Sequence, residues 1–181
     1  MIAEIPSEWR DLLERIQVFA PSALIAGGAV RDWYLGQTPR DIDIFVGDMV
    51  PKHEFQAIGL EEIADSYIES AEHDDSVSAS AGFNGYSLPV NVIWCARDTE
   101  PMDRFTRFDF GICKAAFNGK EVILHNEFHW DVKYRIFTLR RASNPQQTME
   151  SFYRYNRLKQ RYPYSLVIPA DLTLPFYKDA L

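Results

Sequence analysis

The chain contains few cysteines and no long apolar run, and both absences narrow what it can be. Cys95 and Cys113 are the two cysteines among 181 residues, and because their spacing matches no metal-binding pattern we expect buried free thiols. No stretch approaches the ~20 apolar residues of a membrane span, and the N-terminal residues lack a signal-peptide pattern. We therefore expect a cytoplasmic protein that makes no membrane contact.

Positive charge is scarce overall but concentrated in one segment. The formal net charge of −7 argues against uniform affinity for nucleic acid. Residues 133–161 nevertheless carry a net charge of +7, which leaves −14 for the remainder of the chain. The basic residues of this segment are Lys133, Arg135, Arg140, Arg141, Arg154, Arg157, Lys159 and Arg161. The segment is a candidate contact for RNA.

A short apolar run followed by a glycine pair forms the first half of a candidate site. Residues 23–26 are too few for a helix and are followed by Gly27, so we predict a buried strand. Where such a strand gives way to a helix, backbone N–H groups are left unpaired and favour an anion. Gly27 and Gly28 allow a phosphate to approach the backbone, and Arg31 lies one turn further on. This pattern favours nucleotide binding.

Two aspartates in the next apolar run form the second half. Side chains alternate along a strand, so Asp41 and Asp43 share one face while Ile42 and Ile44 point to the core. Carboxylates about 7 Å apart along a strand suit a hard cation such as Mg²⁺ that also binds phosphates. The alternative is a charged face on an edge strand.

The two halves together resemble a known family. Gly-Gly-Ala-Val-Arg-Asp at 27–32 followed by Arg-Asp-Ile-Asp-Ile-Phe at 40–45 resembles the head domain of the tRNA nucleotidyltransferase and poly(A) polymerase family, part of the polymerase-beta-like nucleotidyltransferase superfamily. The resemblance implies that Gly27, Gly28 and Arg31 hold a nucleoside triphosphate. It also implies that Asp41 and Asp43 hold Mg²⁺, as a two-ion site, with Mn²⁺ as an alternative. Asp32 is expected to fix the loop.

Two departures from the family pattern bear on activity. A third carboxylate of the metal site is expected on a later strand, and Asn91 stands at the matching position. Residues 107–115 resemble an Arg-Arg-Asp-Phe-Thr-Ile-Asn motif, with Asp109 at its aspartate and Phe108 where an arginine is usual. Asp109 is therefore a candidate catalytic residue and metal ligand, with a structural ion pair as the alternative. Arg107 remains a candidate triphosphate contact.

The last third resembles the beginning of the family's helical neck. Asp131, residues 138–141 and Asn144-Pro145 match it weakly, and a helix is predicted over 146–162. Arg154 and Arg157 share a face of this helix and are candidate nucleotide contacts. No acid pair stands at the base-reading positions, so the family's base selectivity cannot be carried over. The alternative is a solvated basic face.

The expected fold class is α/β (α+β), with the polymerase-beta-like nucleotidyltransferase fold: a mixed, mostly antiparallel sheet, packed helices and a short C-terminal helical extension. We expect a head over 1–127 and a truncated neck-like extension over 128–181. Helices are predicted over 7–19 with Ser7 as N-cap, and over 30–35, 52–58, 60–71 and 146–162. Strands are predicted over 76–81, 86–95 and 121–125, with turns at 83–85 and 118–119.

Two histidine-containing stretches do not have the pattern of a metal site. His73, Asp74 and Asp75 lie in a row, as in a solvated loop, instead of converging. His125 and His129 are four residues apart, the spacing of two ligands on a helix, but no third ligand follows and we do not expect a helix there.

The predicted reaction is transfer of a nucleoside monophosphate from a triphosphate to a hydroxyl, with an RNA 3′ end as the preferred acceptor. Modification of a protein or small molecule is one alternative. Nucleotide binding without catalysis, motivated by Asn91 and Phe108, is the other. The short chain is compatible with the small versions of this head found in phage genomes. The sequence does not determine the nucleotide, the acceptor or the oligomeric state.

Overall fold

The computed structural model describes residues 4–69 and 76–174. Its described residues fall into two compact units, one from Met1–Thr106 and Ala115–Ile123 and the other from Arg107–Lys114 and Leu124–Leu181. Residues 107–114 thus group with the later part of the chain, whereas the segments directly before and after them belong to the first unit. The tract at 73–75 lies outside the described residues. No helix among the described residues is both long and apolar enough to cross a bilayer.

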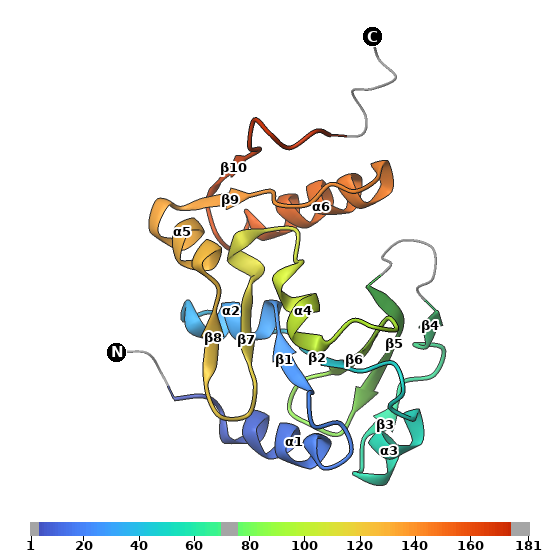
Figure 1. Cartoon of the computed structure of the whole chain (residues 1–181). Helices are drawn as coiled ribbons and strands as arrows, with labels where there is room; N and C mark the ends of the chain where they lie inside the picture. Colours follow the sequence, from blue (N-terminus) through green and yellow to red (C-terminus); the bar gives the residue numbers. More distant parts are fainter. Residues whose placement is uncertain (1–3, 70–75, 175–181) are drawn as a thin grey trace. The chain divides into compact units, whose positions relative to one another are not determined.

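Most of the first unit is one sheet with helices packed against it (Figure 1). Within the described residues, the strand order is β3-β5-β6-β2-β1-β7-β8, and β4 also pairs with β5. In chain order the strands are β1 (Leu24–Ala26), β2 (Ile42–Val46), β3 (Glu61–Glu62), β4 (Ile68–Glu69), β5 (Val77–Asn84), β6 (Val90–Cys95), β7 (Ala115–Phe117) and β8 (Val122–Leu124). β2 and β6 are parallel. β1 is antiparallel to both of its neighbours, β2 and β7, and β5 is antiparallel to β6. The predicted mixed, mostly antiparallel sheet is confirmed.

The helices of this unit are α1 (Ser7–Gln17), α2 (Gly28–Tyr34), α3 (Lys52–Ala57) and α4 (Pro101–Thr106). Apolar residues at helical spacing bury one face of α1, including Trp9, Leu12 and Ile16. The prediction of Ser7 as N-cap is wrong, because Ser7 is already helical and Pro6 precedes it without a side-chain capping bond. Cys95 and Cys113 are both buried, as expected, and no disulfide joins them.

The helix predicted over 60–71 is wrong. This stretch contains the short strands β3 and β4, which both pair with β5. The Ile63 N–H bonds the carbonyl of Gly82 at 2.9 Å, and a Cβ at Gly82 would lie 3.3 Å from the Ile63 side chain. Tyr67 and Ile68 of this stretch are 45% and 61% exposed. Backbone pairing to an open sheet edge has outweighed a helical apolar spacing.

The second unit is built from α5 (Asn126–Tyr134), α6 (Pro145–Leu158), the 3₁₀ turn η1 (Gly111–Cys113) and the two-stranded parallel sheet β9 (Ile136–Thr138) and β10 (Ser165–Val167). α5 contradicts the expectation that the segment around His125 and His129 is not helical. The His125 ring accepts a hydrogen bond from the Glu127 N–H at 3.3 Å and so caps this helix. Among described residues, no three His, Cys, Asp or Glu side chains converge as a metal site.

α6 begins with Pro145 in its first turn, as predicted, and ends at Leu158, four residues earlier than predicted. Asn144 is its N-cap. Its buried face is not apolar throughout: Ser151 is buried, whereas Met149 and Tyr153 are 41% and 66% exposed. The small polar residues of α6 face inward because they form hydrogen bonds there, as described for Ser151 below.

A fully buried carboxylate connects α5 to its neighbours in this unit. Asp131 accepts hydrogen bonds from the Ile112 N–H at 2.9 Å, the Thr138 N–H at 3.1 Å and the Thr138 hydroxyl at 2.6 Å. Burial raises the pKa of Asp131 above 3.8, and the bonds from Thr138 and Ile112 offset this only in part. The carboxyl thus joins α5 to η1 and β9.

Gly111 is predicted to be required for this packing. An added Cβ would lie 2.8 Å from both the Asp131 Oδ2 and the Glu127 carbonyl oxygen. Gly111→Ala should therefore lower the free energy of unfolding by about 1–3 kcal/mol, measured by urea denaturation. Gly47→Ala is the matched control, since nothing lies within 4 Å of a Cβ there. Equal stability of the two variants would contradict this packing.

The raised pKa of Asp131 predicts a direction for the pH dependence of stability. The folded state binds this proton more tightly than the unfolded chain, so the contribution of Asp131 is complete below pH 3.8 and is lost as pH rises through the folded-state pKa. The unfolding free energy of the wild type minus that of Asp131→Asn, which cannot titrate, should therefore fall as pH rises from below 3.8 to neutrality. A difference that stays constant or rises would refute the assignment.

Candidate functional site

The turn between β1 and α2 is closed by glycine. Gly27 has φ 79° and ψ −124°, a conformation that glycine adopts readily. Its N–H donates to the Ala115 carbonyl at 2.8 Å and is therefore not among the N–H groups available to an anion. The first helical bond of α2 runs from the Arg31 N–H to the Gly27 carbonyl at 3.0 Å. The N–H groups of the three residues between them therefore have no acceptor within the helix.

Arg31 lies directly behind this turn. Its Nε donates to the Asp32 Oδ1 at 2.8 Å and its Nη2 lies 2.6 Å from the same oxygen. Both residues are buried, and a Cβ at Gly28 would lie 3.8 Å from the Arg31 Nη2. The pair therefore stabilises the backbone beside Gly28 with a buried, charge-assisted contact.

The two aspartates lie at the start of β2, with their neighbours in the core. Ile42 and Ile44 are fully buried, while Asp41 and Asp43 are partly exposed, as strand alternation predicts. β1 pairs with β2 in the register Ile25↔Ile44. One further step in this antiparallel register puts the last residue of β1 opposite Asp43. The glycine turn and the aspartates thus lie at the same edge of the sheet.

Asn91 lies beside Asp43 on the neighbouring strand. β2 and β6 pair in the register Asp43↔Asn91, and the Asn91 Nδ2 donates to the Asp43 Oδ1 at 2.9 Å. An amide thus occupies an oxygen that could otherwise bind a cation. The family pattern has a third carboxylate at this position, whereas Asn91 of this chain is a hydrogen-bond donor.

A guanidinium that the sequence analysis did not select lies near the same face of the sheet. Arg104 of α4 lies with its guanidinium carbon 6.0 Å from the centre of the Phe45 ring. Phe45 is two residues after Asp43, so both side chains project from the same face of β2. The residue spacing gave no signal for this, because the approach depends on how α4 packs.

Asp109 is held within the second unit. Its Oδ1 accepts from the Arg154 Nη1 at 2.7 Å, and its Oδ2 accepts from the Ser151 hydroxyl at 2.8 Å. Asp109 is 6% exposed, and Phe108 beside it is also buried. The structure therefore contains the ion pair that the sequence analysis considered as the alternative for Asp109. Asp109 joins the stretch before η1 to α6.

The remaining candidate arginines, Arg107 and Arg157, are exposed residues of the second unit. Arg154 and Arg157 both belong to α6, as predicted. Gly27, Gly28, Arg31, Asp41 and Asp43 belong to the first unit.

A buried lysine in the second unit was also missed. Lys114 is 5% exposed and its ammonium contacts the Glu127 carboxylate, which also lies 3.2 Å from the Arg140 Nε. Lys114 directly follows η1, Glu127 belongs to α5 and Arg140 lies two residues after β9, so residue spacing does not predict this contact. Glu127 is thus neutralised by basic neighbours.

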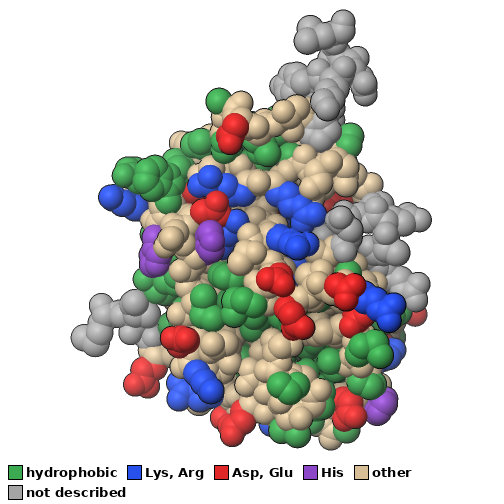
Figure 2. Space-filling model, in the orientation of Figure 1, with side chains coloured by type: hydrophobic (Ala, Val, Ile, Leu, Met, Phe, Trp, Pro, Cys, Tyr) green, Lys and Arg blue, Asp and Glu red, His purple; other side chains and the backbone are tan. Residues whose placement is uncertain are grey.

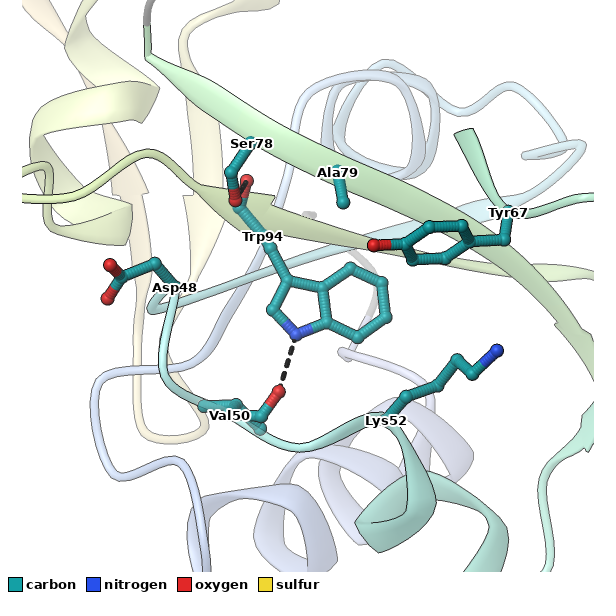
Figure 3. A pocket seen from close by; sticks show the side chains of 7 residues that line it. All are labelled: Asp48, Val50, Lys52, Tyr67, Ser78, Ala79 and Trp94. Atoms are coloured by element: carbon teal, nitrogen blue, oxygen red, sulfur yellow. Dashed lines mark hydrogen bonds between the residues drawn. The ribbon is translucent and has the colours of Figure 1, made fainter. Parts of the chain in front are cut away.

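A separate hollow of about 320 Å³ opens at the other end of β2 (Figure 3). The Trp94 indole forms part of its wall and donates to the Val50 carbonyl at 2.7 Å. Tyr67 lies edge-on to Trp94, with the Lys52 ammonium 5.0 Å from the centre of the Tyr67 ring. The lining residues are Asp48, Val50, Lys52, Tyr67, Ser78, Ala79 and Trp94. This hollow contains none of the predicted site residues.

Solved structures with the same fold include several enzymes of tRNA. A tRNA-processing enzyme in an apo form matches with a TM-score of 0.63 at 19% identity, covering 92% of this chain and 46% of that one. The Thermotoga maritima CCA-adding enzyme complexed with tRNA matches at 0.62 and 22%, covering 91% and 40%. The Bacillus stearothermophilus CCA-adding enzyme in complex with CTP matches at 0.62 and 18%, covering 91% and 42%.

These matches establish the fold that the motifs predicted, that of the head domain of the tRNA nucleotidyltransferase family. The chain spans less than half the length of each of these enzymes. A search of curated protein sequences gives no match.

A family model also matches the chain directly. The match runs over residues 4–135, which includes the glycine turn, both aspartates and Asn91. The family is described as Gabija anti-defense 2 family protein. The match covers well over half of the chain, and the chain therefore belongs to the Gabija anti-defense 2 family.

Proposed function

We propose that this protein transfers a nucleoside monophosphate from a nucleoside triphosphate to a hydroxyl group, with an RNA 3′ end as acceptor. The observation that carries the proposal is the pairing of β1 with β2, in the register Ile25↔Ile44. It sets a glycine-closed turn suited to phosphate beside two aspartates suited to a cation. A phosphate and its counter-ion require these two features at one place.

The donor set at this edge fits Mg²⁺, with Mn²⁺ as an alternative. Mg²⁺ is commonly held by one or two carboxylates together with substrate phosphates and water. Asp41 and Asp43 would supply the carboxylates. When bound, such ions neutralise phosphate charge and activate a hydroxyl nucleophile.

Each proposed role follows from a contact or an exposure. The backbone at Gly27 and Gly28 would approach the triphosphate, with Arg31 behind the turn as a positive charge held by Asp32. These groups would hold the substrate phosphates for in-line attack, which is the main requirement of phosphoryl transfer.

Asp109 has a positioning role in this proposal. Both of its oxygens accept hydrogen bonds from Arg154 and Ser151 of α6, which leaves it poorly placed to give up an oxygen to a metal ion. Asp109 would instead orient Arg154 within the second unit, where the exposed Arg157 follows three residues later on the same helix.

RNA is the proposed acceptor because of charge and fold. Residues 133–161 carry +7 in a chain of −7, and one structural neighbour is a CCA-adding enzyme complexed with tRNA. The family description names an anti-defense role directed at Gabija. We infer that nucleotidyl transfer at this site serves that role.

Removal of the two carboxylates is predicted to abolish transfer. The protein is incubated with each labelled triphosphate, Mg²⁺, RNAs and proteins, and label is followed into each class of acceptor. Asp41→Asn with Asp43→Asn should reduce labelling of RNA by about a hundredfold or more, because charge stabilisation at the phosphate is lost. Asp48→Asn, beyond the other end of β2, is the control and should retain full activity.

Label that enters protein instead of RNA would support the modification alternative for the acceptor. Equal labelling by the double variant and the wild type would exclude transfer at this site.

A second candidate function is nucleotide binding without transfer. The observation in its favour is the hydrogen bond from Asn91 to Asp43. The amide donor stabilises the Asp43 carboxylate, as a bound cation would. A site with two carboxylates and an adjacent donor could bind a nucleotide while turning it over slowly or not at all.

Asn91→Asp is predicted to convert this position into a cation ligand. A third carboxylate beside Asp43 should tighten Mn²⁺ binding by about tenfold or more, measured by calorimetry, because affinity rises with the charge of the ligand set. Without metal, this variant should be less stable than the wild type because two carboxylates face each other. Asn91→Ala controls for loss of the amide and should gain no Mn²⁺ affinity. Unchanged affinity in Asn91→Asp would show that residue 91 does not face the cation.

A further inference from the structure

The solvent face of α5 carries two large aromatic side chains. Trp130 and Tyr134 are four residues apart, and their ring centres lie 4.4 Å apart with an angle of 51° between the ring planes. They are 53% and 48% exposed, whereas Trp9 and Trp94 in the first unit are 2% and 5% exposed. Water therefore contacts about half of each of these two rings, which is unusual for such large apolar surfaces.

Helical periodicity separates this face from the packed side of α5. Phe128 and Asp131 are fully buried, so the side of α5 that packs within the second unit is opposite. His129 and Lys133 are exposed on the same side as the aromatic pair. Figure 2 shows hydrophobic, histidine and basic side chains gathered on the part of the surface where Figure 1 places α5.

The charge that accompanies the aromatic pair is positive. The Lys133 ammonium lies 5.1 Å from the centre of the Tyr134 ring, and Arg135, directly after the helix, is exposed. The acids of α5 do not oppose this charge: Asp131 is fully buried, and Glu127 contacts Lys114 and Arg140. An anionic partner with flat apolar rings would complement both features of this face.

We propose that the solvent face of α5, formed by Trp130, Lys133, Tyr134 and Arg135, binds single-stranded RNA. Unpaired bases would stack on the two rings, and the phosphates would lie against Lys133 and Arg135. A duplex would bind less well, because its bases are already stacked and their faces are not accessible. The choice of RNA over other strands rests on the proposed function, whereas the stacking surface itself does not.

Binding is tested on the full chain without nucleoside triphosphate. Fluorescence anisotropy is measured with a labelled single-stranded oligoribonucleotide, the same sequence as a duplex, and the corresponding single-stranded DNA. Trp130→Ala with Tyr134→Ala should weaken binding of single-stranded RNA by about tenfold or more, since stacking contributes about 1–3 kcal/mol per base. Trp130→Phe with Tyr134→Phe should restore most of the affinity, because an aromatic face remains.

Tyr67→Ala is the matched control. Tyr67 is an exposed tyrosine, at 45%, with a lysine near its ring, and it lies in the first unit. This variant should bind RNA as the wild type does. Thermal unfolding of all variants should be close to that of the wild type, because the substituted side chains are at the surface.

Three results would overturn the inference: unchanged binding in the double alanine variant, equal affinity for duplex and single strand, or tighter binding of DNA than of RNA. Light scattering could show that the wild type is a dimer and the double alanine variant a monomer, with RNA binding unchanged. That result would assign the surface to a second copy of the chain instead.

The same assay separates this inference from the proposed function. Adding Trp130→Ala and Tyr134→Ala to the Asp41→Asn, Asp43→Asn variant should weaken its binding of single-stranded RNA by the same factor as in the wild type, because α5 is intact in both backgrounds. If transfer fails and RNA binding still depends on Trp130 and Tyr134, the stacking surface is supported. If label is transferred and RNA binding does not depend on these residues, the stacking surface is excluded and the proposed nucleotidyl transfer is unaffected.

Discussion

The pairing of β2 with β1 on one side and β6 on the other decides which side chains of the first unit can act together. With β1, it sets the glycine turn beside Asp43. With β6, it sets Asn91 against the same carboxylate. A shift of either register by one residue would turn Asp43 toward the core and bring Ile42 or Ile44 to the outer face. The full burial of these two isoleucines therefore stabilises the register on which the candidate site depends.

The packing of the second unit depends on buried acids that accept hydrogen bonds from neighbouring elements. Asp131 joins α5 to η1 and β9, and Asp109 joins the stretch before η1 to α6. A buried carboxylate is tolerated only where such donors replace water. These acids explain why a chain stretch that resembles a catalytic motif is at the same time a structural junction. They also explain why α6 presents small polar residues inward and exposes Met149 and Tyr153.

The family assignment and the fold concern different properties of the chain. The Gabija anti-defense 2 match covers residues 4–135 and ends at α5 and its C-terminal turn. The structural likeness to CCA-adding enzymes extends over 91–92% of the chain at 18–22% identity. A nucleotidyltransferase fold retained at such low identity is expected where core packing tolerates replacement while the backbone architecture persists. Function then depends on the few side chains at the edge of the sheet, among which Asn91 is the clearest departure from the pattern of three carboxylates.

The motifs at 27–32 and 40–45 indicated the fold through their resemblance to a known family. The residues themselves predicted the strand alternation at 41–44, the glycine turn, the turn at 118–119 and the start of α6. Each of these depends on neighbouring residues, through side-chain periodicity or backbone conformation. The hydrogen bond from Asn91 to Asp43, the ion pair of Asp109 with Arg154 and the approach of Arg104 to Phe45 were decided only by tertiary structure.

Tertiary structure also decided the strands at 61–62 and 68–69 and the helix α5. In these segments the local pattern was ambiguous or misleading. The outcome depended on an open edge of β5 that accepts further strands, and on Asp131, which finds its donors in η1 and β9 only when 126–134 is helical. Contacts between residues far apart in the chain depend on strand order and helix packing, and no local pattern contains that information.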